Sequence, residues 1–184
     1  MTNKFMDMDN EALVRYISRL EEDFVGVQRI MHIFIKLKNE IMYDTIKKTE
    51  QPASETLVMG YGNNFNKNNL LCAVLQLADY QCELRYKNVK DNTKWLFSRN
   101  SKIIPWYYVK VNYYGTVINL DCSFDRRFMN AARIVYQGDK VDYRLEDFHF
   151  EGGKLFEVVS DPYAYEIKAA KYRTDELGSG RLCI

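Results

Sequence analysis

The spacing of apolar residues changes from helical to alternating near residue 80, and this change constrains the fold more than any other feature. Before it, apolar side chains recur every three or four positions in residues 11–46 and 66–78, which is typical of amphipathic helices. After it, apolar and polar side chains alternate in residues 81–89, 106–112 and 117–120, which is typical of strands with one buried face. Helices followed by a run of antiparallel strands predict an α+β fold.

Several boundaries can be placed from residues that cap helices or interrupt them. Asp7 or Asp9 is expected to cap the first helix, and Asn64 or Asn66 the central helix, because these side chains accept hydrogen bonds from unpaired backbone N–H groups. Residues 47–55 are expected to be a polar break. Further short strands are expected over residues 133–136 and 155–159.

The length and composition of the chain predict one folded domain. It has 184 residues, of which 47% are hydrophobic and 14% aromatic, and a chain of this kind can bury enough apolar surface to offset the entropy of ordering. We expect residues 1–174 to form a single domain and residues 175–184, which include Gly178-Ser179-Gly180, to form a flexible tail.

The same composition argues against membranes and nucleic acids as partners. No apolar stretch approaches the roughly 20 residues needed to cross a bilayer, and residues 1–10 lack the basic and apolar segments of a secretory signal. We therefore expect a cytoplasmic protein. The 26 basic and 25 acidic residues nearly cancel, whereas proteins that bind nucleic acid usually have an excess of positive charge.

The cysteines give no sign of a metal site or a redox pair. Cys72, Cys82, Cys122 and Cys183 are scattered and form no C-x-x-C pair. Cys72 and Cys82 are expected to be small buried hydrophobic residues. The sequence therefore predicts no metal and no other cofactor.

Three segments within residues 25–130 carry a pattern in a fixed order. The long N-terminal helix is expected to end with IMYD, residues 41–44. The second segment is GNNFNKNNLLCAVL, residues 62–75, in which a glycine and asparagines precede the central helix. The predicted hairpin begins with WYYVKV, residues 106–111, turns at Gly115 and ends in LDCSFD, residues 120–125.

Together these segments resemble the transglutaminase-like superfamily of papain-type cysteine enzymes. In that family a helix ends in a similar I-x-Y-D, and a glycine and one variable residue precede a cysteine before an LLxALL helix. A histidine then precedes a W-V-E-V strand, a glycine turn and L-D-P-T-x-D. The resemblance implies a papain-like core in which N-terminal helices and a central helix pack on an antiparallel sheet.

The family pattern has a chemical reason. A thiolate is the attacking species, and the start of a helix lowers the pKa of a thiol because partial positive charge gathers there. A histidine on a facing strand accepts the thiol proton, and an aspartate holds the imidazole in the useful tautomer.

This sequence departs from the pattern at two of the three positions. The cysteine position falls on Asn64, the histidine position falls on Trp106, and the aspartate is kept as Asp121. An asparagine cannot supply a thiolate, and an indole cannot accept a proton at neutral pH. We therefore expect a noncatalytic domain that binds a peptide or a protein, with Tyr61, Asn63 and Tyr108 as possible residues of a retained cleft.

Two alternatives remain open. An enzyme with relocated residues would need a thiol such as Cys72 or Cys122 beside His32 or His149. A purely structural or oligomeric protein would have its cleft filled by Trp106 and an apolar patch elsewhere. The sequence does not indicate the oligomeric state.

Overall fold

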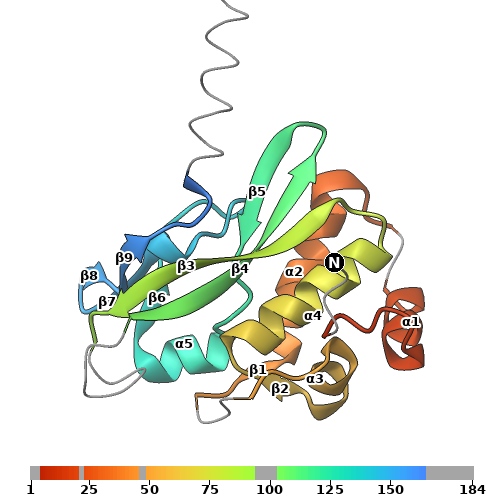
Figure 1. The fold of residues 1–184 in the computed structure, drawn as a ribbon, viewed down its shortest axis with the longest axis horizontal. Coiled ribbons are helices and arrows are strands. Elements are labelled where there is room, and N and C mark those ends of the chain that lie inside the picture. Colours follow the sequence, from red (N-terminus) through yellow and green to blue (C-terminus); the bar gives the residue numbers. More distant parts are fainter. Residues whose placement is uncertain (1–4, 21–22, 46–48, 94–102, 165–184) are drawn as a thin grey trace, which may run out of the picture.

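The computed structural model of the protein describes residues 5–20, 23–45, 49–93 and 103–164, and Figure 1 shows how they are arranged. The helices are α1 (Glu11–Ser18), α2 (Gly26–Glu40), α3 (Ala53–Met59), α4 (Asn64–Leu77) and α5 (Arg126–Ala132), with a short 3₁₀ turn at Leu145–Asp147. The strands are β1 (Met42–Tyr43), β2 (Tyr61–Gly62), β3 (Cys82–Asp91), β4 (Ile103–Tyr113), β5 (Thr116–Leu120), β6 (Ile134–Tyr136), β7 (Phe148–Phe150), β8 (Gly153–Lys154) and β9 (Phe156–Ser160).

The central sheet has the strand order β5-β4-β3-β9, and every neighbouring pair in it is antiparallel. The predicted hairpin between β4 and β5 turns at Tyr114 and Gly115, which both adopt a positive φ. The register places Leu84 opposite Val109, and Val109 opposite Leu120. Since side chains alternate between the faces of a strand, this register aligns the apolar residues of three strands on one face.

Helix α4 lies at the centre of the domain and is buried on all sides. It contacts β3 and β4 on one side and α1, α2 and α3 on the others. Every residue from Asn64 to Leu75 is buried, including Lys67, Asn68 and Asn69. The amphipathic pattern predicted for this helix is therefore only partly right, because its polar side is also covered.

Two apolar clusters lie on opposite faces of the central sheet. The first joins the helices to the sheet and includes Ile30, Leu37, Leu71, Val109 and Leu120. The second lies between the sheet and the C-terminal strands and includes Val89, Trp106, Phe124, Phe148 and Phe156. The central sheet is thus covered on both faces, at least in part.

The predicted end of the N-terminal helix is only partly right. Helix α2 ends at Glu40, and Met42–Tyr43 pairs in parallel with Tyr61–Gly62 as a two-stranded sheet. The segment IMYD therefore leads out of the helix as a short strand instead of forming its last turn.

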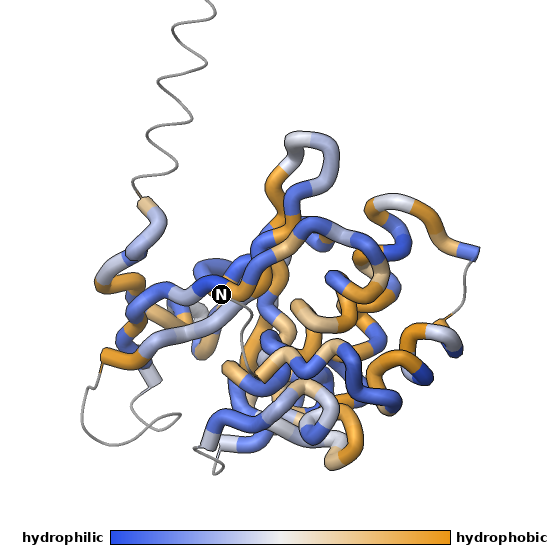
Figure 2. Tube along the Cα trace, turned by 45° about the vertical axis from the view of Figure 1, so that its right-hand side comes forward, coloured by the Kyte–Doolittle hydropathy of each residue, from blue (hydrophilic) through white to orange (hydrophobic). Residues whose placement is uncertain are grey.

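Hydrophobic and hydrophilic positions are interspersed along the coloured part of the tube in Figure 2. Within the described residues, no helix is both long enough and apolar enough to span a membrane. The predicted tail, residues 175–184, and the preceding residues 165–174 lie outside the described part of the chain.

Candidate functional site

The three positions that the sequence pattern predicts for a Cys-His-Asp triad lie in or next to three different elements, and all are buried. Asn64 is the first residue of α4, immediately after Asn63, whose side chain caps the helix by accepting a 2.9 Å hydrogen bond from the Asn66 N–H. Trp106 lies in β4, and Asp121 follows the last residue of β5. The exposed fractions of Asn64, Trp106 and Asp121 are 7%, 1% and 0%.

The Trp106 indole is hydrogen-bonded to the Asp121 carboxylate. Its Nε1–H donates to Oδ2 over 2.7 Å, while Oδ1 accepts hydrogen bonds from the backbone N–H of Ser123, at 2.9 Å, and from its hydroxyl. Burial raises the pKa of the Asp121 carboxyl, and the hydrogen bonds from Ser123 and Trp106 oppose this increase. The indole thus occupies the place at the aspartate that the resemblance assigns to an imidazole.

The side chain of Asn64 is fixed by hydrogen bonds at both ends of its amide. Its Oδ1 accepts from the backbone N–H of Tyr107 over 2.7 Å. Its Nδ2 donates to the Tyr107 carbonyl oxygen over 2.8 Å and to the Ser123 hydroxyl over 2.7 Å. Through Ser123, the asparagine is therefore connected to Asp121.

Asn68, one turn further along α4, repeats this arrangement. Its Nδ2 donates to the Tyr107 carbonyl at 3.0 Å and to the Ser123 hydroxyl at 3.1 Å, and its Oδ1 accepts from the backbone N–H of Cys122 at 2.9 Å. Asn64 and Asn68 thus hold α4 against β4 and the segment after β5. Among the described residues of this network, no thiol side chain contacts a base.

The cysteines near this network are poorly suited to nucleophilic chemistry. Burial raises the pKa of the Cys122 thiol to about 11, although the nearby charges of Lys67 and Lys38 act in the opposite direction. The Cys72 thiol lies 3.8 Å from the Cys82 thiol, and this contact and burial raise its pKa. Thiols with a raised pKa are largely protonated at neutral pH and react slowly.

In the described part of the chain, the two histidines contact other residues and not the cysteines. His32 stacks on Phe24, with ring centroids 4.6 Å apart, and His149 in β7 places Nδ1 3.0 Å from the Asp147 carbonyl. Among the described residues, no hydrogen bond joins a cysteine to a histidine. The same part of the chain contains no group of three or more His, Cys, Asp or Glu residues that could hold a metal ion.

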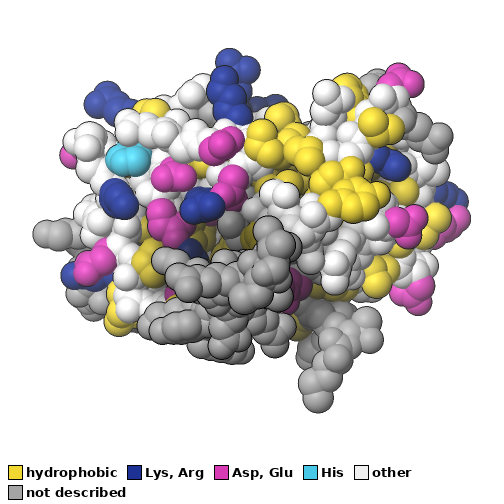
Figure 3. All heavy atoms as spheres, turned by 90° about the horizontal axis from the view of Figure 1, so that it is seen from above, with side chains coloured by type: hydrophobic (Ala, Val, Ile, Leu, Met, Phe, Trp, Pro, Cys, Tyr) yellow, Lys and Arg dark blue, Asp and Glu magenta, His cyan; other side chains and the backbone are white. Residues whose placement is uncertain are grey.

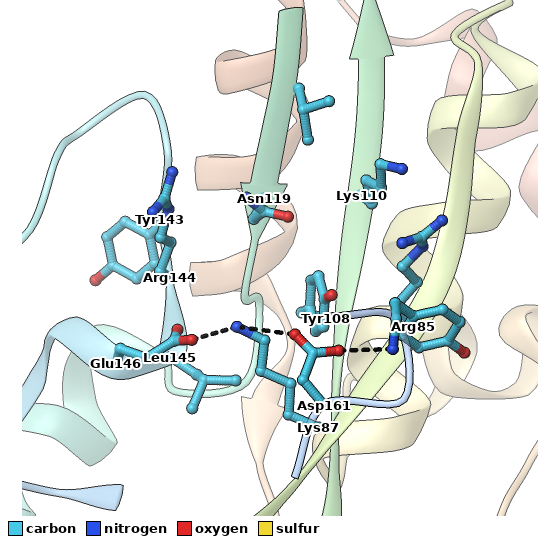
Figure 4. A pocket seen from close by; sticks show the side chains of 12 residues that line it. Arg85, Lys87, Tyr108, Lys110, Asn119, Tyr143, Arg144, Leu145, Glu146 and Asp161 are labelled. Carbon is cyan, nitrogen blue, oxygen red and sulfur yellow. Dashed lines mark hydrogen bonds and ion pairs between the residues drawn. The ribbon is translucent and has the colours of Figure 1, made fainter. Parts of the chain in front are cut away.

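A cavity of about 450 Å³ lies on the face of the central sheet that is turned away from α4 (Figure 4). Its lining comes from β3, β4 and β5, from the segment before and within the 3₁₀ turn, and from the segment after β9: Arg85, Lys87, Tyr108, Lys110, Val117, Asn119, Tyr143, Arg144, Leu145, Glu146, Asp161 and Tyr163. Tyr108, one of the three expected cleft residues, lines this cavity. Tyr61 lies in β2 and Asn63 caps α4, and neither lines it.

The alternation of residues in β3, β4 and β5 is the sequence signal for this cavity. Arg85, Lys110 and Asn119 alternate with Leu84, Val109 and Ile118, which belong to the core beneath the helices. Strand alternation therefore puts the polar residues together on the opposite face. What the sequence could not show is that residues 143–146 and 161–163 border this face and turn it into a cavity.

Charged side chains at one end of the cavity bind one another. The Lys87 ammonium pairs with Glu146 and lies 3.7 Å from the Asp161 carboxylate, which also accepts a 2.9 Å hydrogen bond from the backbone of Tyr163 (Figure 4). The Arg85 guanidinium lies over the Tyr163 ring, 4.4 Å from its centroid, a cation–π arrangement. Burial raises the pKa of the Tyr108 phenol, so this hydroxyl stays protonated.

The surface seen from above the domain carries both signs of charge. Basic and acidic side chains lie interspersed among the described residues of this face, as Figure 3 shows, and no broad area of one sign stands out among them. This distribution agrees with a sequence that has 26 basic and 25 acidic residues.

Comparisons with known proteins give a likeness in fold. No family model matches the sequence, and no curated protein matches it. Among solved structures, a chain described as "a putative cysteine protease from Cytophaga hutchinsonii" is similar, with a TM-score of 0.54 and 11% sequence identity. The match covers 67% of this chain and 40% of that one.

The two chains share a fold. Helices packed on a curled antiparallel sheet form an α+β structure that is consistent with a papain-like core, as the sequence predicted. Because the chain matches less than half of the solved structure's length and at low identity, the likeness carries no activity over to it.

Proposed function

We propose that the protein is a noncatalytic, transglutaminase-like domain that binds a peptide or a protein. The observation that carries the noncatalytic part is the 2.7 Å hydrogen bond from the Trp106 indole to Asp121. A Cys-His-Asp site needs an imidazole at this position, because the imidazole accepts the proton of the thiol and later returns it. The indole N–H can only donate, and so it supports the carboxylate without taking part in proton transfer.

The position of Asn64 supports the same proposal. The start of α4 is where a helix would favour a thiolate, but the residue there is an amide that hydrogen-bonds the backbone of Tyr107 at both of its ends. A side chain held in this way stabilises the contact between α4 and β4. Both replacements therefore convert the positions of the triad into structural contacts.

The cavity on the opposite sheet face supports the binding part of the proposal. Its volume of about 450 Å³ falls within the range of sites that hold small ligands or a few side chains of a peptide. It combines aromatic and aliphatic walls with charged groups, which is the usual composition of a specific binding site.

The alternative of an enzyme with relocated residues has less support. The thiols of Cys72 and Cys122 have raised pKa values, and both side chains are fully buried. A nucleophile needs access to its substrate and a group that removes its proton. Neither condition is met by these two cysteines.

Two measurements test the proposal on the full chain. The first is hydrolysis and transamidation of peptide and glutamine substrates, with and without iodoacetamide, in the wild type and in the Cys72→Ala and Cys122→Ala variants. We expect no turnover in any sample. Turnover that iodoacetamide removes, and that one of the two substitutions abolishes, would overturn the noncatalytic assignment.

The second measurement is binding of the purified chain to an array of peptides with varied sequence, followed by calorimetric titration of the peptides that bind. We expect a set of peptides with shared chemical features and saturable binding. If no peptide from the array binds saturably, the peptide-binding proposal fails.

A further inference from the structure

We infer that Cys72 and Cys82 form a reversible disulfide in the folded domain, by exchange with a small disulfide such as oxidised glutathione. This modification site goes beyond the proposed binding function and does not depend on it. The spacing of the two residues does not indicate a redox pair, since they lie ten positions apart along the chain. The fold brings their sulfur atoms to 3.8 Å from each other.

A tight reversal of the chain places the two cysteines side by side. Cys72 lies in α4, and Cys82 is the first residue of β3. Between these elements Asp79 adopts a positive φ of 65°, and the Tyr80 N–H donates to the Leu75 carbonyl over 3.0 Å. The strand therefore begins beside the helix that it follows, and α4 and β3 remain in contact.

Hydrogen bonds hold the backbone on the strand side of this pair. The Gln76 amide donates a 2.9 Å hydrogen bond to the Cys82 carbonyl and lies 3.8 Å from the Cys72 sulfur. The Asn112 N–H donates to the Gln81 carbonyl over 2.8 Å, which ties the residue before β3 to β4. The two thiols thus face each other from ordered backbone. Such positioning favours their reaction with each other over reaction with a second molecule.

The sulfur atoms are close enough to bond after a small movement. A disulfide bond is about 2.05 Å long, so the two atoms must approach each other by about 1.8 Å from their present separation of 3.8 Å. The Cys82 sulfur also lies 3.5 Å from the Cys72 carbonyl oxygen, and so it is already turned toward α4. Rotation about the Cα–Cβ bonds moves sulfur atoms over distances of this size.

The exposure of the two thiols sets the order of the steps. Cys82 is partly exposed and Cys72 is 0% exposed, so the Cys82 thiolate attacks oxidised glutathione first. The S–S bond of glutathione breaks, and one glutathione thiol leaves. The Cys72 thiolate then attacks the Cys82 sulfur and expels the second glutathione. Two thiols of the chain are oxidised, one glutathione disulfide is reduced to two thiols, and these take up the two protons that the cysteines lose.

The second step takes place inside the fold. The hydrogen bond with Cys82 is the largest cause of the raised pKa of the Cys72 thiol, and burial is the next. Once the Cys82 sulfur carries glutathione, this thiol–thiol hydrogen bond is gone, and its part of the pKa increase is lost. Cys72 then reacts with a sulfur that it already contacts. Direct modification of Cys72 by a reagent still requires the domain to open.

The experiment incubates the reduced full chain with excess oxidised glutathione in native buffer, alkylates the remaining thiols and digests the chain with trypsin. Both cysteines lie on one tryptic peptide, residues 68–85. We expect this peptide to lose two hydrogen atoms and to carry neither glutathione nor an alkyl group. Excess reduced glutathione should restore both thiols. Glutathione that stays on Cys82, a bond from Cys82 to another cysteine, or two unreacted thiols would each overturn the inference.

Substitutions separate the two steps of the exchange. Cys72→Ala should stop at a glutathione adduct on Cys82, and Cys82→Ala should leave residues 68–85 without any adduct. Cys183→Ser is the matched control, because it removes a thiol outside the pair, and it should form the same bond as the wild type. Circular dichroism shows whether each variant is folded, and the wild-type peptide decides the inference if one is not.

The rate of the reaction shows whether the bond closes in the folded domain. Cys122 is 1% exposed, so its reaction with glutathione reports how often the domain opens. We expect the bond between Cys72 and Cys82 to form at least about tenfold faster than Cys122 reacts. Equal rates would mean that the pair closes only in the opened chain, and the assignment of a site in the folded domain would be wrong.

Discussion

The indole Nε1 of Trp106 donates a 2.7 Å hydrogen bond to Oδ2 of Asp121, and both side chains are buried in the domain. The sequence pattern predicts that Asp121 matches the aspartate of a Cys-His-Asp site, where the partner of the aspartate is an imidazole that moves protons. Here the aromatic ring belongs to an apolar cluster, where it lies 4.6 Å from Phe156 and 5.4 Å from Phe124. The pair therefore joins the apolar cluster to a buried polar network.

The first prediction is that Trp106 and Asp121 are energetically coupled. Trp106→Phe keeps an aromatic ring but leaves a buried carboxylate oxygen without its donor, which should cost about 2 kcal/mol of unfolding free energy. In the Trp106→Phe variant, Asp121→Asn should lower the unfolding free energy less than it does in the wild type. The difference between the two losses, which is the coupling energy, should be about 1 kcal/mol or more. Urea unfolding of the two single variants and the double variant measures this coupling.

The control for this cycle is Asp7→Asn combined with Trp106→Phe. Asp7 binds Ser54 on the helical side of the domain, so its effect should add to that of Trp106→Phe within about 0.5 kcal/mol. Additive effects in the Trp106 and Asp121 cycle would show that the hydrogen bond does not couple them.

The second prediction concerns Asn64, the first residue of α4. Asn64→Ala removes the partner of the Tyr107 N–H and one of the two donors to the Tyr107 carbonyl, which keeps its hydrogen bond from Asn68. An unpaired buried N–H group costs about 1–3 kcal/mol. The matched control is Asn39→Ala, because Asn39 is exposed on α2 and its side chain also binds backbone groups. Denaturant unfolding should show a loss of less than about 1 kcal/mol for the control, and equal losses for both variants would contradict the prediction.

The sequence predicts the elements well where the apolar period is regular. The helix over residues 66–78 and the strands over 81–89, 106–112 and 117–120 are confirmed as α4, β3, β4 and β5. The short strands expected near 133–136 and 155–159 are found as β6 and β9. In each of these segments, local propensity and burial favour the same structure.

The errors lie where a tertiary contact decides the local structure. Asp7 and Asp9 do not cap the first helix, because Asn10 accepts the hydrogen bond from Ala12 and Asp7 binds Ser54 instead. Residues 47–55 were expected to be a break, but α3 begins at Ala53, which is fully buried and donates its backbone N–H to the Phe5 carbonyl. No local pattern shows that Asp7 binds Ser54 or that Ala53 binds Phe5.

The candidate site was only partly accessible to sequence reasoning. The family pattern brought Asn64, Trp106 and Asp121 to attention, but it could not show Ser123 as the residue that connects Asn64 with Asp121. A serine that follows an aspartate by two residues has no special signature. Its role depends on how the end of β5 meets α4, which only the folded chain shows.

The third prediction is that the thiols differ in reactivity. Cys72 and Cys122 are 0% and 1% exposed, whereas Cys82 at the start of β3 is partly exposed. Ellman's reagent should therefore modify Cys82 in the folded protein, and Cys72 and Cys122 only when the domain opens. The control is the same reaction in denaturant, where all sites react, with mass spectrometry of peptides to assign each thiol. Rapid modification of Cys122 in the folded protein would contradict its burial and revive a relocated active site.

The fourth prediction is a pH-dependent stability contributed by Lys67. This side chain is 1% exposed, and its ammonium donates to the carbonyl oxygens of Lys38 and Ile41 at the end of α2. Burial lowers its pKa from 10.5 to about 8. Between these values the unfolded chain holds the proton and the folded chain does not, so the lysine makes the folded state more stable as the pH rises. Below about pH 8 both states are protonated, and the burial cost of the charge is fully present.

The test compares wild type with Lys67→Met, because other groups also titrate in this range. Thiols and tyrosines whose pKa values are raised by burial, such as Cys122 and Tyr108, lower the stability as the unfolded chain ionises. The difference in unfolding free energy between wild type and Lys67→Met isolates the contribution of Lys67. As the pH rises from about 7.5 to about 9.5, this difference should change by about 2 kcal/mol in favour of the wild type. Lys36→Met, at a partly exposed position of α2, should follow the wild-type curve. Parallel curves for Lys67→Met and wild type would mean that the buried lysine keeps its ordinary pKa.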